Sequence, residues 1–274
     1  TKMNAGSARY ALMLGEDGMV KDDGIICKIS DEHFIATTTT GGAANVLACM
    51  EEYAQTEWPN LNVYMNSITE QFATFNISGP KTRDIMSKVF SEIDFSNQAF
   101  PFMTFQFHEF QNTQLRIMRA SFTGEMGYEI YVPSNSALKI WEQIQEAGKK
   151  FGLTPYGTET MHLLRAEKGY IIIGQDTDGS ITPIDLGLNW MIGKTKNDFL
   201  GKRSLTRSDT VRPDRKQLVG ILPLNKEDSL EEGQHILLNE SLQTPVPMLG
   251  HITSSYHSPI MGHTFGLAVI KDGR

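Results

Sequence analysis

One short stretch limits the fold more than any other, because it joins a glycine-rich turn to a strict alternation of polar and apolar side chains. It is residues 121–133, Ser-Phe-Thr-Gly-Glu-Met-Gly-Tyr-Glu-Ile-Tyr-Val-Pro. Glycine adopts positive φ and tolerates close backbone approach, so this stretch predicts a sharp turn followed by a strand. Along that strand, Glu129 and Tyr131 face opposite to Ile130 and Val132. A carboxylate at a strand start beside a turn is better placed to bind a polar ring than to fill a core.

The composition allows a large core and excludes several classes of partner. The 274 residues are 40% hydrophobic, which predicts one large domain or two closely packed ones. A net charge of −7 argues against nucleic acid and against anionic membranes. No apolar run approaches the ~18 residues that a membrane helix needs. The seven histidines lack metal-ligand spacing, so we expect no metal site.

The two cysteines predict free thiols in a reducing compartment. Cys27 and Cys49 lie in apolar surroundings and form no Cys-x-x-Cys motif. We therefore expect both to be buried and reduced, and the protein to be cytoplasmic.

The two ends suggest a fragment of a longer polypeptide. The sequence starts at Thr1 without methionine, and it ends at Lys271-Asp272-Gly273-Arg274 just after a strand-like run. Asp-Gly is a hairpin signal, yet no second strand follows it here.

The first two thirds of the chain predict an α+β body. We expect a hairpin over residues 10–40, a helix of about fifteen residues after Gly41-Gly42, and two strands within residues 61–78. A helix over residues 81–90, three strands within residues 103–132 and an amphipathic helix over residues 137–151 follow. The buried face of the last helix is expected to hold Leu138, Ile140, Trp141, Ile144 and Ala147.

The last third changes character. Short strands with turn signals about every ten residues predict a small β-barrel or jelly-roll subdomain. We place the boundary so that residues 1–208 form the body and residues 209–274 the subdomain. No Gly-x-Gly-x-x-Gly follows a strand, so flavin and NAD are expected only outside this span or in partner subunits.

Motifs along nearly the whole chain resemble the folate-binding aminomethyltransferase family, whose type member is the T-protein of the glycine cleavage system. The turn in residues 121–133 is similar to that family's Gly-Tyr-Thr-Gly-Glu-Asp-Gly-Phe-Glu, and residues 15–24 are similar to its Gly-Gly-x-x-Asp-Asp turn. Further matches are Leu164-Arg165-Ala166-Glu167, Gly174-Gln175-Asp176-Thr177-Asp178, Phe199-Leu200-Gly201-Lys202 and Ile252-Thr253-Ser254-Ser255. The resemblance implies an aminomethyltransferase-like folate-binding fold with tetrahydrofolate as the cofactor.

The resemblance also implies roles for four residues. Asp23 matches the aspartate beside the reactive folate nitrogens, and we assign it the catalytic role, with Asp22 structural; from composition alone, a solvated hairpin is the alternative. Glu129 matches the glutamate that holds the aminopyrimidine edge of the pterin, against the alternative of a solvent-facing glutamate at a strand edge. Tyr10 matches a tyrosine near the pterin, although ordinary strand packing explains it equally well. Arg165 is expected to support the folate site, paired with Glu167 or with a ligand carboxylate.

Within the family, one branch is most similar: the carboxy-terminal part of the alpha subunit of heterotetrameric sarcosine oxidase. Its markers include Gly157-Thr158-Glu159-Thr160-Met161-His162, where free-standing T-proteins carry Arg-Asp in place of Met161-His162. This likeness implies a hetero-oligomer with other oxidase subunits, in which the one-carbon unit from sarcosine is trapped as 5,10-methylenetetrahydrofolate.

Two other functions stay open from the sequence. The first is a stand-alone aminomethyltransferase that accepts carbon from a lipoylated carrier. The second is a folate-binding or assembly module without chemistry, because formaldehyde and tetrahydrofolate condense without a catalyst. Loss of activity in an Asp23 variant that still binds folate separates catalysis from simple binding.

Overall fold

The computed structural model describes residues 3–239 and 244–274, and the chain falls into two compact units. The amino-terminal unit is formed by Lys2–Ala11 and Gly24–Tyr156, and the carboxy-terminal unit by Leu12–Asp23 and Gly157–Arg274. The sequence predicts a domain boundary after residue 208. This boundary differs from the division between the two compact units and stays a prediction.

The chain begins with a three-stranded sheet of order β1-β2-β3, in the region where the sequence predicts a hairpin over residues 10–40. Its strands are β1 (Ala8–Leu14), β2 (Val20–Lys28) and β3 (Phe34–Ala36). The division between the two units passes through β1 and β2. These strands therefore supply side chains to both units.

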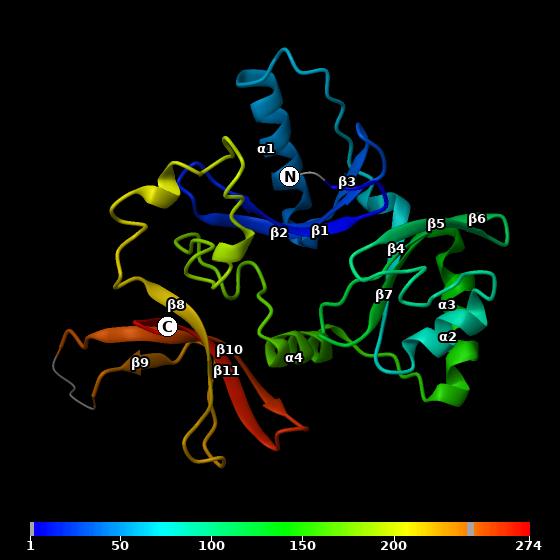
Figure 1. The fold of residues 1–274 in the computed structure, drawn as a ribbon. Helices are drawn as coiled ribbons and strands as arrows, with labels where there is room; N and C mark the ends of the chain where they lie inside the picture. The colour runs from blue at the N-terminus through cyan, green and yellow to red at the C-terminus, as the bar shows by residue number, and fades with distance from the viewer. Residues whose placement is uncertain (1–2, 240–243) are drawn as a thin grey trace. The chain divides into compact units, whose positions relative to one another are not determined.

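The amino-terminal unit is built on a four-stranded antiparallel sheet of order β4-β7-β6-β5 (Figure 1). Its strands are β4 (Phe72–Ser78), β5 (Phe105–Phe110), β6 (Thr113–Met118) and β7 (Gly127–Pro133). Three α-helices accompany them: α1 (Ala43–Thr56), α2 (Thr82–Val89) and α3 (Ala137–Gly148). Single 3₁₀ turns, η1 to η4, lie at Thr40–Gly42, Thr69–Gln71, Ser134–Ser136 and Lys149–Phe151.

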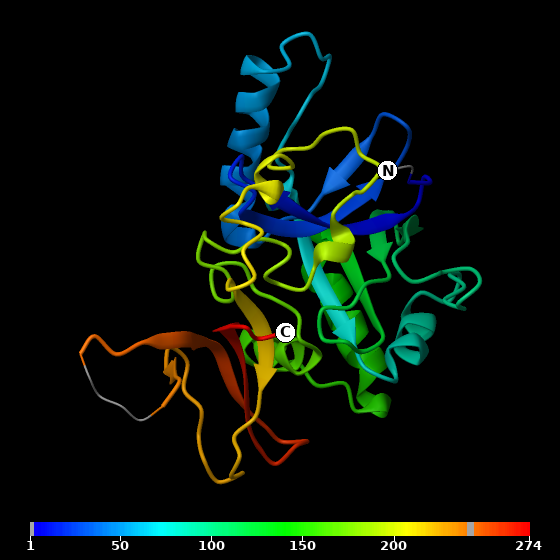
Figure 2. The same cartoon turned by 60° about the vertical axis from the view of Figure 1, so that its left-hand side comes forward.

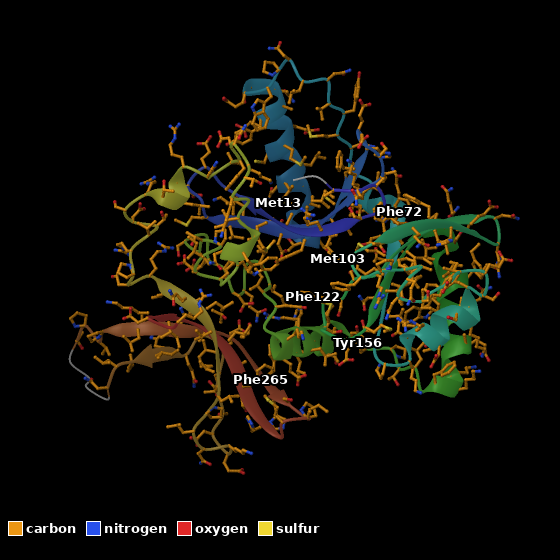
Figure 3. All side chains as sticks on the ribbon, viewed as in Figure 1. Met13, Phe72, Met103, Phe122, Tyr156 and Phe265 are labelled. Atoms are coloured by element: carbon orange, nitrogen blue, oxygen red, sulfur yellow. The ribbon has the colours of Figure 1, made fainter. Side chains whose placement is uncertain are left out.

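Strand alternation gives this sheet two apolar faces. One face packs on α2 and α3 in a core that contains Ile117, Ile130, Val132, Ile85 and Ile140. The other face contributes to a second cluster, formed by Ala8, Cys27, Phe105, Met118, Ala120 and Tyr131. Phe72 and Met103, labelled in Figure 3, are partly buried against this second cluster. The sheet is thus covered on both sides within the unit.

Three expectations about this unit are wrong. Residues 61–71 form no strand, and only β4 remains of the two predicted there. In α3, Leu138 is 70% exposed and Trp141 36% exposed, whereas Ile140, Ile144 and Ala147 of the expected buried face lie in the core. Cys27 is buried as expected, whereas Cys49 is exposed on α1, a helix with no buried residue.

The carboxy-terminal unit contains a second four-stranded antiparallel sheet, of order β8-β11-β10-β9 (Figures 1 and 2). Its strands are β8 (Lys216–Ile221), β9 (His235–Leu237), β10 (Met248–Ser258) and β11 (His263–Lys271). The helix α4 (Thr158–Lys168) and the 3₁₀ turns η5 (Asn189–Met191) and η6 (Ser204–Thr206) precede them. The sequence predicts strands over residues 217–222, 235–238, 250–254 and 266–270, and each of them is present.

Close backbone packing fixes this second sheet. At Gly250 a Cβ would come within 1.9 Å of the Val269 backbone oxygen, so β10 and β11 approach where only glycine fits. The core beneath contains Ala166 from α4 together with Leu218, Phe265, Leu267 and Val269 from the sheet. The α+β class with a carboxy-terminal β-rich subdomain is confirmed.

Candidate functional site

The turn before β7 aims the strand that carries Glu129. Gly124 has a φ of 81°, a conformation that side chains rarely adopt, and it allows the reversal that the sequence predicts. At Gly127 a Cβ would lie 2.7 Å from the Ala120 backbone oxygen. Larger residues at Gly127 would push the turn away from β7, so this glycine keeps the strand start in place.

Glu129 lies on the face of β7 that alternation predicts. Ile130 and Val132 are fully buried in the core under α2 and α3, and Tyr131 belongs to the cluster on the opposite face. Across the sheet, Glu129 pairs with Asn76 on β4 and with Met118 on β6. Its carboxylate is therefore flanked on both sides by neutral side chains.

The Glu129 carboxylate is half-buried and is held by a neighbour on the same strand. The Tyr131 hydroxyl donates a hydrogen bond to Glu129 Oε2. Burial raises the pKa of Glu129, while this hydrogen bond and the positive charge of Arg116 act in the opposite direction. Arg116, on β6, places its guanidinium carbon 3.8 Å from the centre of the Tyr131 ring.

Cys27, on β2, packs in the cluster that contains Met118 and Tyr131. Its sulfur lies 3.7 Å from Met118 Sδ, and burial raises the pKa of the thiol to about 11. A thiol of that pKa is neutral and unreactive at physiological pH. Cys27 is a packing residue here.

Tyr10 is half-buried on β1, two residues after Ala8. Alternation puts both side chains on one face of the strand, and Ala8 packs in the cluster that contains Tyr131. Its predicted place beside the pterin stays a prediction. Phe122, labelled in Figure 3, lies in the turn before β7 and carries no hydroxyl.

The two adjacent aspartates on β2 have different surroundings. Asp22 is 3% exposed, and its Oδ1 accepts a hydrogen bond from the Asp23 backbone N–H at 2.8 Å. Asp23 is partly exposed at the end of the segment that belongs to the carboxy-terminal unit. This fits a structural Asp22, while the catalytic role of Asp23 stays a prediction.

Arg165, on α4, is fully buried and engaged by protein groups. It forms an ion pair with Asp176, and its Nη2 donates to Ser254 Oγ at 2.8 Å. Its Nη1 also donates to the Tyr170 backbone oxygen at 2.9 Å. Of the two partners that the sequence allows, Glu167 is not paired with Arg165: the ion pair is with Asp176, and Glu167 accepts a hydrogen bond from Ser258 Oγ.

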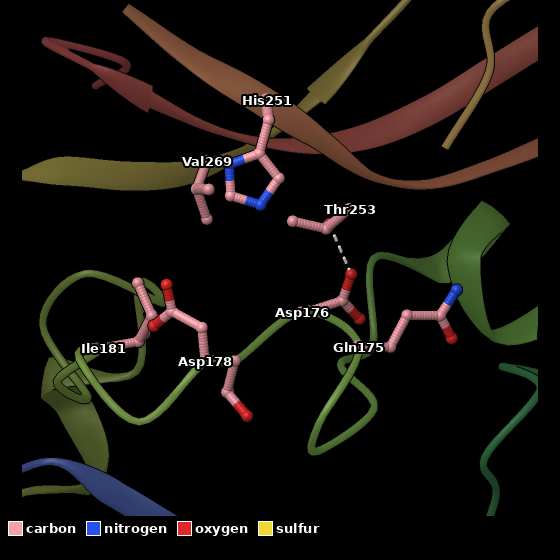
Figure 4. Close-up of a pocket in the computed structure, with 8 residues that line it drawn as sticks. Gln175, Asp176, Asp178, Ile181, His251, Thr253 and Val269 are labelled. Carbon is pink, nitrogen blue, oxygen red and sulfur yellow. Dashed lines mark hydrogen bonds between the residues drawn. The ribbon is translucent and has the colours of Figure 1, made fainter. Parts of the chain in front are cut away.

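Asp176 is the partner that the sequence reading missed. It is 1% exposed and also accepts a hydrogen bond from Thr253 Oγ1 at 2.6 Å, which Figure 4 shows as a dashed line. Two strand residues on β10, a loop aspartate and a helix arginine thus form one buried network. The cofactor-binding role assigned to Arg165 stays a prediction, because the contacts that the structure shows for its guanidinium are internal.

The structure brings Glu129, Tyr131 and Arg116 together in the amino-terminal unit, whereas Asp23 and Arg165 belong to the carboxy-terminal unit. Sequence reasoning missed Tyr131 and Arg116. The sequence did contain one signal for them: Arg116 is a charged residue between the apolar residues Leu115 and Ile117. That Arg116 lies opposite Tyr131, however, follows only from the register of β6 and β7.

Two other features of the described residues bear on function. In residues 3–239 and 244–274, no group of three His, Cys, Asp or Glu side chains is arranged to hold a metal ion. None of the helices in the same residues is long and apolar enough to cross a membrane.

Relatives of two kinds are similar to this chain. The chain is 50% identical to the sarcosine oxidase subunit alpha of Corynebacterium sp. (strain P-1) and 42% identical to that of Rhizobium meliloti (strain 1021), in both cases over all of this chain and 28% of the relative. It is 29% identical to an aminomethyltransferase of Thermoanaerobacter sp. (strain X514), over 98% of this chain and 70% of the relative. The chain therefore spans less than a third of the sarcosine oxidase subunits it matches.

The fold is that of a solved aminomethyltransferase. The crystal structure of glycine cleavage system aminomethyltransferase T from Bartonella henselae matches with a TM-score of 0.79 at 21% identity, over 98% of this chain and 69% of that one. Residues 1–196 match the GCVT N-terminal domain, and residues 216–274 match the glycine cleavage T-protein C-terminal barrel domain. The chain belongs to the glycine cleavage T-protein family, as the motifs in its turns predict.

Proposed function

We propose that this chain is the tetrahydrofolate-binding part of a sarcosine oxidase alpha subunit. In this role it captures the one-carbon unit from the oxidative demethylation of sarcosine as 5,10-methylenetetrahydrofolate. The proposal is supported by 50% identity to a sarcosine oxidase alpha subunit over the whole chain, against 29% for an aminomethyltransferase.

The observation that carries the proposal is the Glu129 carboxylate. Tyr131 engages Oε2, and the described residues donate no hydrogen bond to Oε1. An ionised carboxylate accepts the two N–H donors of an aminopyrimidine edge through charge-assisted hydrogen bonds, which are stronger than neutral ones. The donor set of a pterin thus fits the acceptor that β7 presents.

Asp23 would act on the reacting carbon. Oxidation of sarcosine by hydride loss gives the iminium CH₂=NH⁺–CH₂COO⁻, and a fixed carboxylate near this cation stabilises it. At 4 Å and an effective dielectric constant of 20, the attraction between unit charges is about 4 kcal/mol. The Asp23 carboxylate can also accept the proton of the attacking folate nitrogen and return it to the departing amine. Both folate N–H protons end on glycine, which leaves with its ammonium group, so the step balances without another reactant.

The oxidation itself would take place outside this chain. The flavin would lie in a partner subunit, and the iminium would pass from there to the folate-binding part. This arrangement makes the protein a hetero-oligomer, in agreement with relatives that are named as subunits.

We expect the assembled oxidase to transfer carbon from sarcosine to tetrahydrofolate even when a chemical trap removes all free formaldehyde. The trap is needed because formaldehyde and tetrahydrofolate also condense in solution. The measurement is the share of isotope-labelled methyl carbon that is recovered as 5,10-methylenetetrahydrofolate.

Two results would contradict this function. If all labelled carbon were recovered in the formaldehyde trap, the protein would not transfer carbon from sarcosine to tetrahydrofolate and would at most bind the folate. Transfer from a lipoylated aminomethyl carrier, but not from sarcosine, would instead establish a stand-alone aminomethyltransferase.

A further inference from the structure

Arg116 and Tyr131 form a buried cross-strand pair beneath Glu129. They are direct neighbours in the register of β6 and β7, and each is 6% exposed. The guanidinium lies over the aromatic ring at 3.8 Å, and its Nε is buried without a hydrogen-bond partner. The ring face therefore holds this cation where a buried arginine would ordinarily be held by an ion pair.

Tyr131 connects this cation to the carboxylate. Its hydroxyl donates to Glu129 Oε2, two residues earlier on the same strand face. Burial and the neighbouring Glu129 raise the pKa of Tyr131, so the phenol stays protonated at every physiological pH. The hydroxyl is a permanent donor, and its acceptor is stronger when Glu129 is ionised.

The ionisation of Glu129 depends on two opposed effects. Burial raises its pKa and favours the neutral acid, whereas Tyr131 and Arg116 favour the anion. From β2, Cys27 faces the same cluster, but its thiol is neutral at a pKa of about 11. On β1, Tyr10 lies on the same strand face as Ala8, and the cross-strand neighbours of Glu129 are Asn76 and Met118.

We propose that Tyr131 is a positioning residue: stacked against Arg116, its hydroxyl fixes one oxygen of the Glu129 carboxylate and favours the ionised form of that carboxylate. A protonated Glu129 would lose charge-assisted acceptance of ligand N–H groups. What Glu129 binds rests on the proposed folate function, whereas its ionisation by Tyr131 does not.

The test is Tyr131→Phe, which removes one oxygen and keeps the ring that Arg116 covers. Loss of a donor to the anion raises the pKa of Glu129 further, by about one pH unit or more. The readout is an NMR titration of ¹³C-labelled glutamate carboxyl groups, with the Glu129 signal assigned by its loss in Glu129→Gln.

Tyr128→Phe is the matched control. Tyr128 lies on the same strand but faces the opposite core, where its hydroxyl donates to the Phe95 backbone oxygen at 3.4 Å. Both variants lose a buried hydroxyl, so both can lose some stability. Only Tyr131→Phe is expected to move the Glu129 titration, and an unchanged Glu129 titration in this variant would overturn the proposal.

A folate titration separates this inference from the proposed function. Tetrahydrofolate affinity is expected to fall as the pH drops through the pKa of Glu129, and in Tyr131→Phe this fall begins at a higher pH. If the wild type binds no tetrahydrofolate at any pH, the proposed function fails. The NMR titration of the ligand-free protein still decides whether Tyr131 controls the carboxylate.

Discussion

Replacing Arg165 by methionine is expected to lower the free energy of unfolding by about 3–5 kcal/mol, because it leaves the buried Asp176 carboxylate without its cation. Both side chains of this ion pair are fully shielded from water. Ser254 and Thr253 also donate to Asp176, but two hydroxyls do not replace a positive charge. The measurement is the midpoint and slope of urea denaturation followed by circular dichroism.

Arg207→Met provides the control. Arg207 pairs with Asp209 at 3.2 Å, but both side chains are more than half exposed, so its loss is expected to change stability by about 0–1 kcal/mol. If Arg165→Met is as stable as this control but no longer binds folate, Arg165 contributes to ligand binding, and its ion pair with Asp176 contributes little to the stability of the fold.

Replacing Asp23 by asparagine is expected to slow one-carbon transfer about a thousandfold, with little change in tetrahydrofolate affinity. The factor follows from the loss of about 4 kcal/mol of attraction between the carboxylate and the iminium cation, if all of it acts in the transition state. Asparagine keeps the size of the side chain but can neither stabilise the cation nor accept a proton. The rate is measured in the assembled oxidase as trap-resistant formation of 5,10-methylenetetrahydrofolate.

Asp17→Asn is the matched change on the adjoining turn. Asp17 is exposed, accepts a hydrogen bond from the Met19 backbone and lies 3.8 Å from Lys21, so its neutralisation should leave the transfer rate unchanged. An Asp23→Asn enzyme with a normal rate and normal affinity would mean that the site only binds folate and that condensation needs no catalyst.

Local patterns in the sequence predict most of the strands, although one of the two expected within residues 61–78 is absent. The alternation after Gly127 places Glu129 and Tyr131 opposite Ile130 and Val132, and the structure confirms it because a strand has only two faces. The buried face of a helix is harder to predict than that of a strand, because the neighbouring elements determine how many of its apolar positions are covered. Leu138 fits the apolar spacing of α3, yet it lies beyond the edge of the core.

The candidate site is predictable only in part, because contacts between distant segments leave no local pattern. Arg165 and Asp176 are eleven residues apart across a helix end and a loop, and β10 completes their network. Arg116 meets Tyr131 only through the register of β6 and β7. Glu129, by contrast, lies in one local motif, a turn followed by strict alternation, and its folate-binding role follows from the family resemblance and stays a prediction.

The most direct measurement is calorimetric titration of tetrahydrofolate into wild type, Glu129→Gln and Glu125→Gln. Glu125 lies exposed in the turn four residues before Glu129. The Glu125→Gln variant therefore removes one negative charge nearby and leaves the proposed pterin-binding carboxylate of Glu129 in place. A pterin held by Glu129 predicts that Glu129→Gln loses about 2 kcal/mol, roughly thirtyfold in affinity, while Glu125→Gln binds as the wild type does. Equal affinities in all three proteins, or no binding by the wild type, would contradict a folate site at β7.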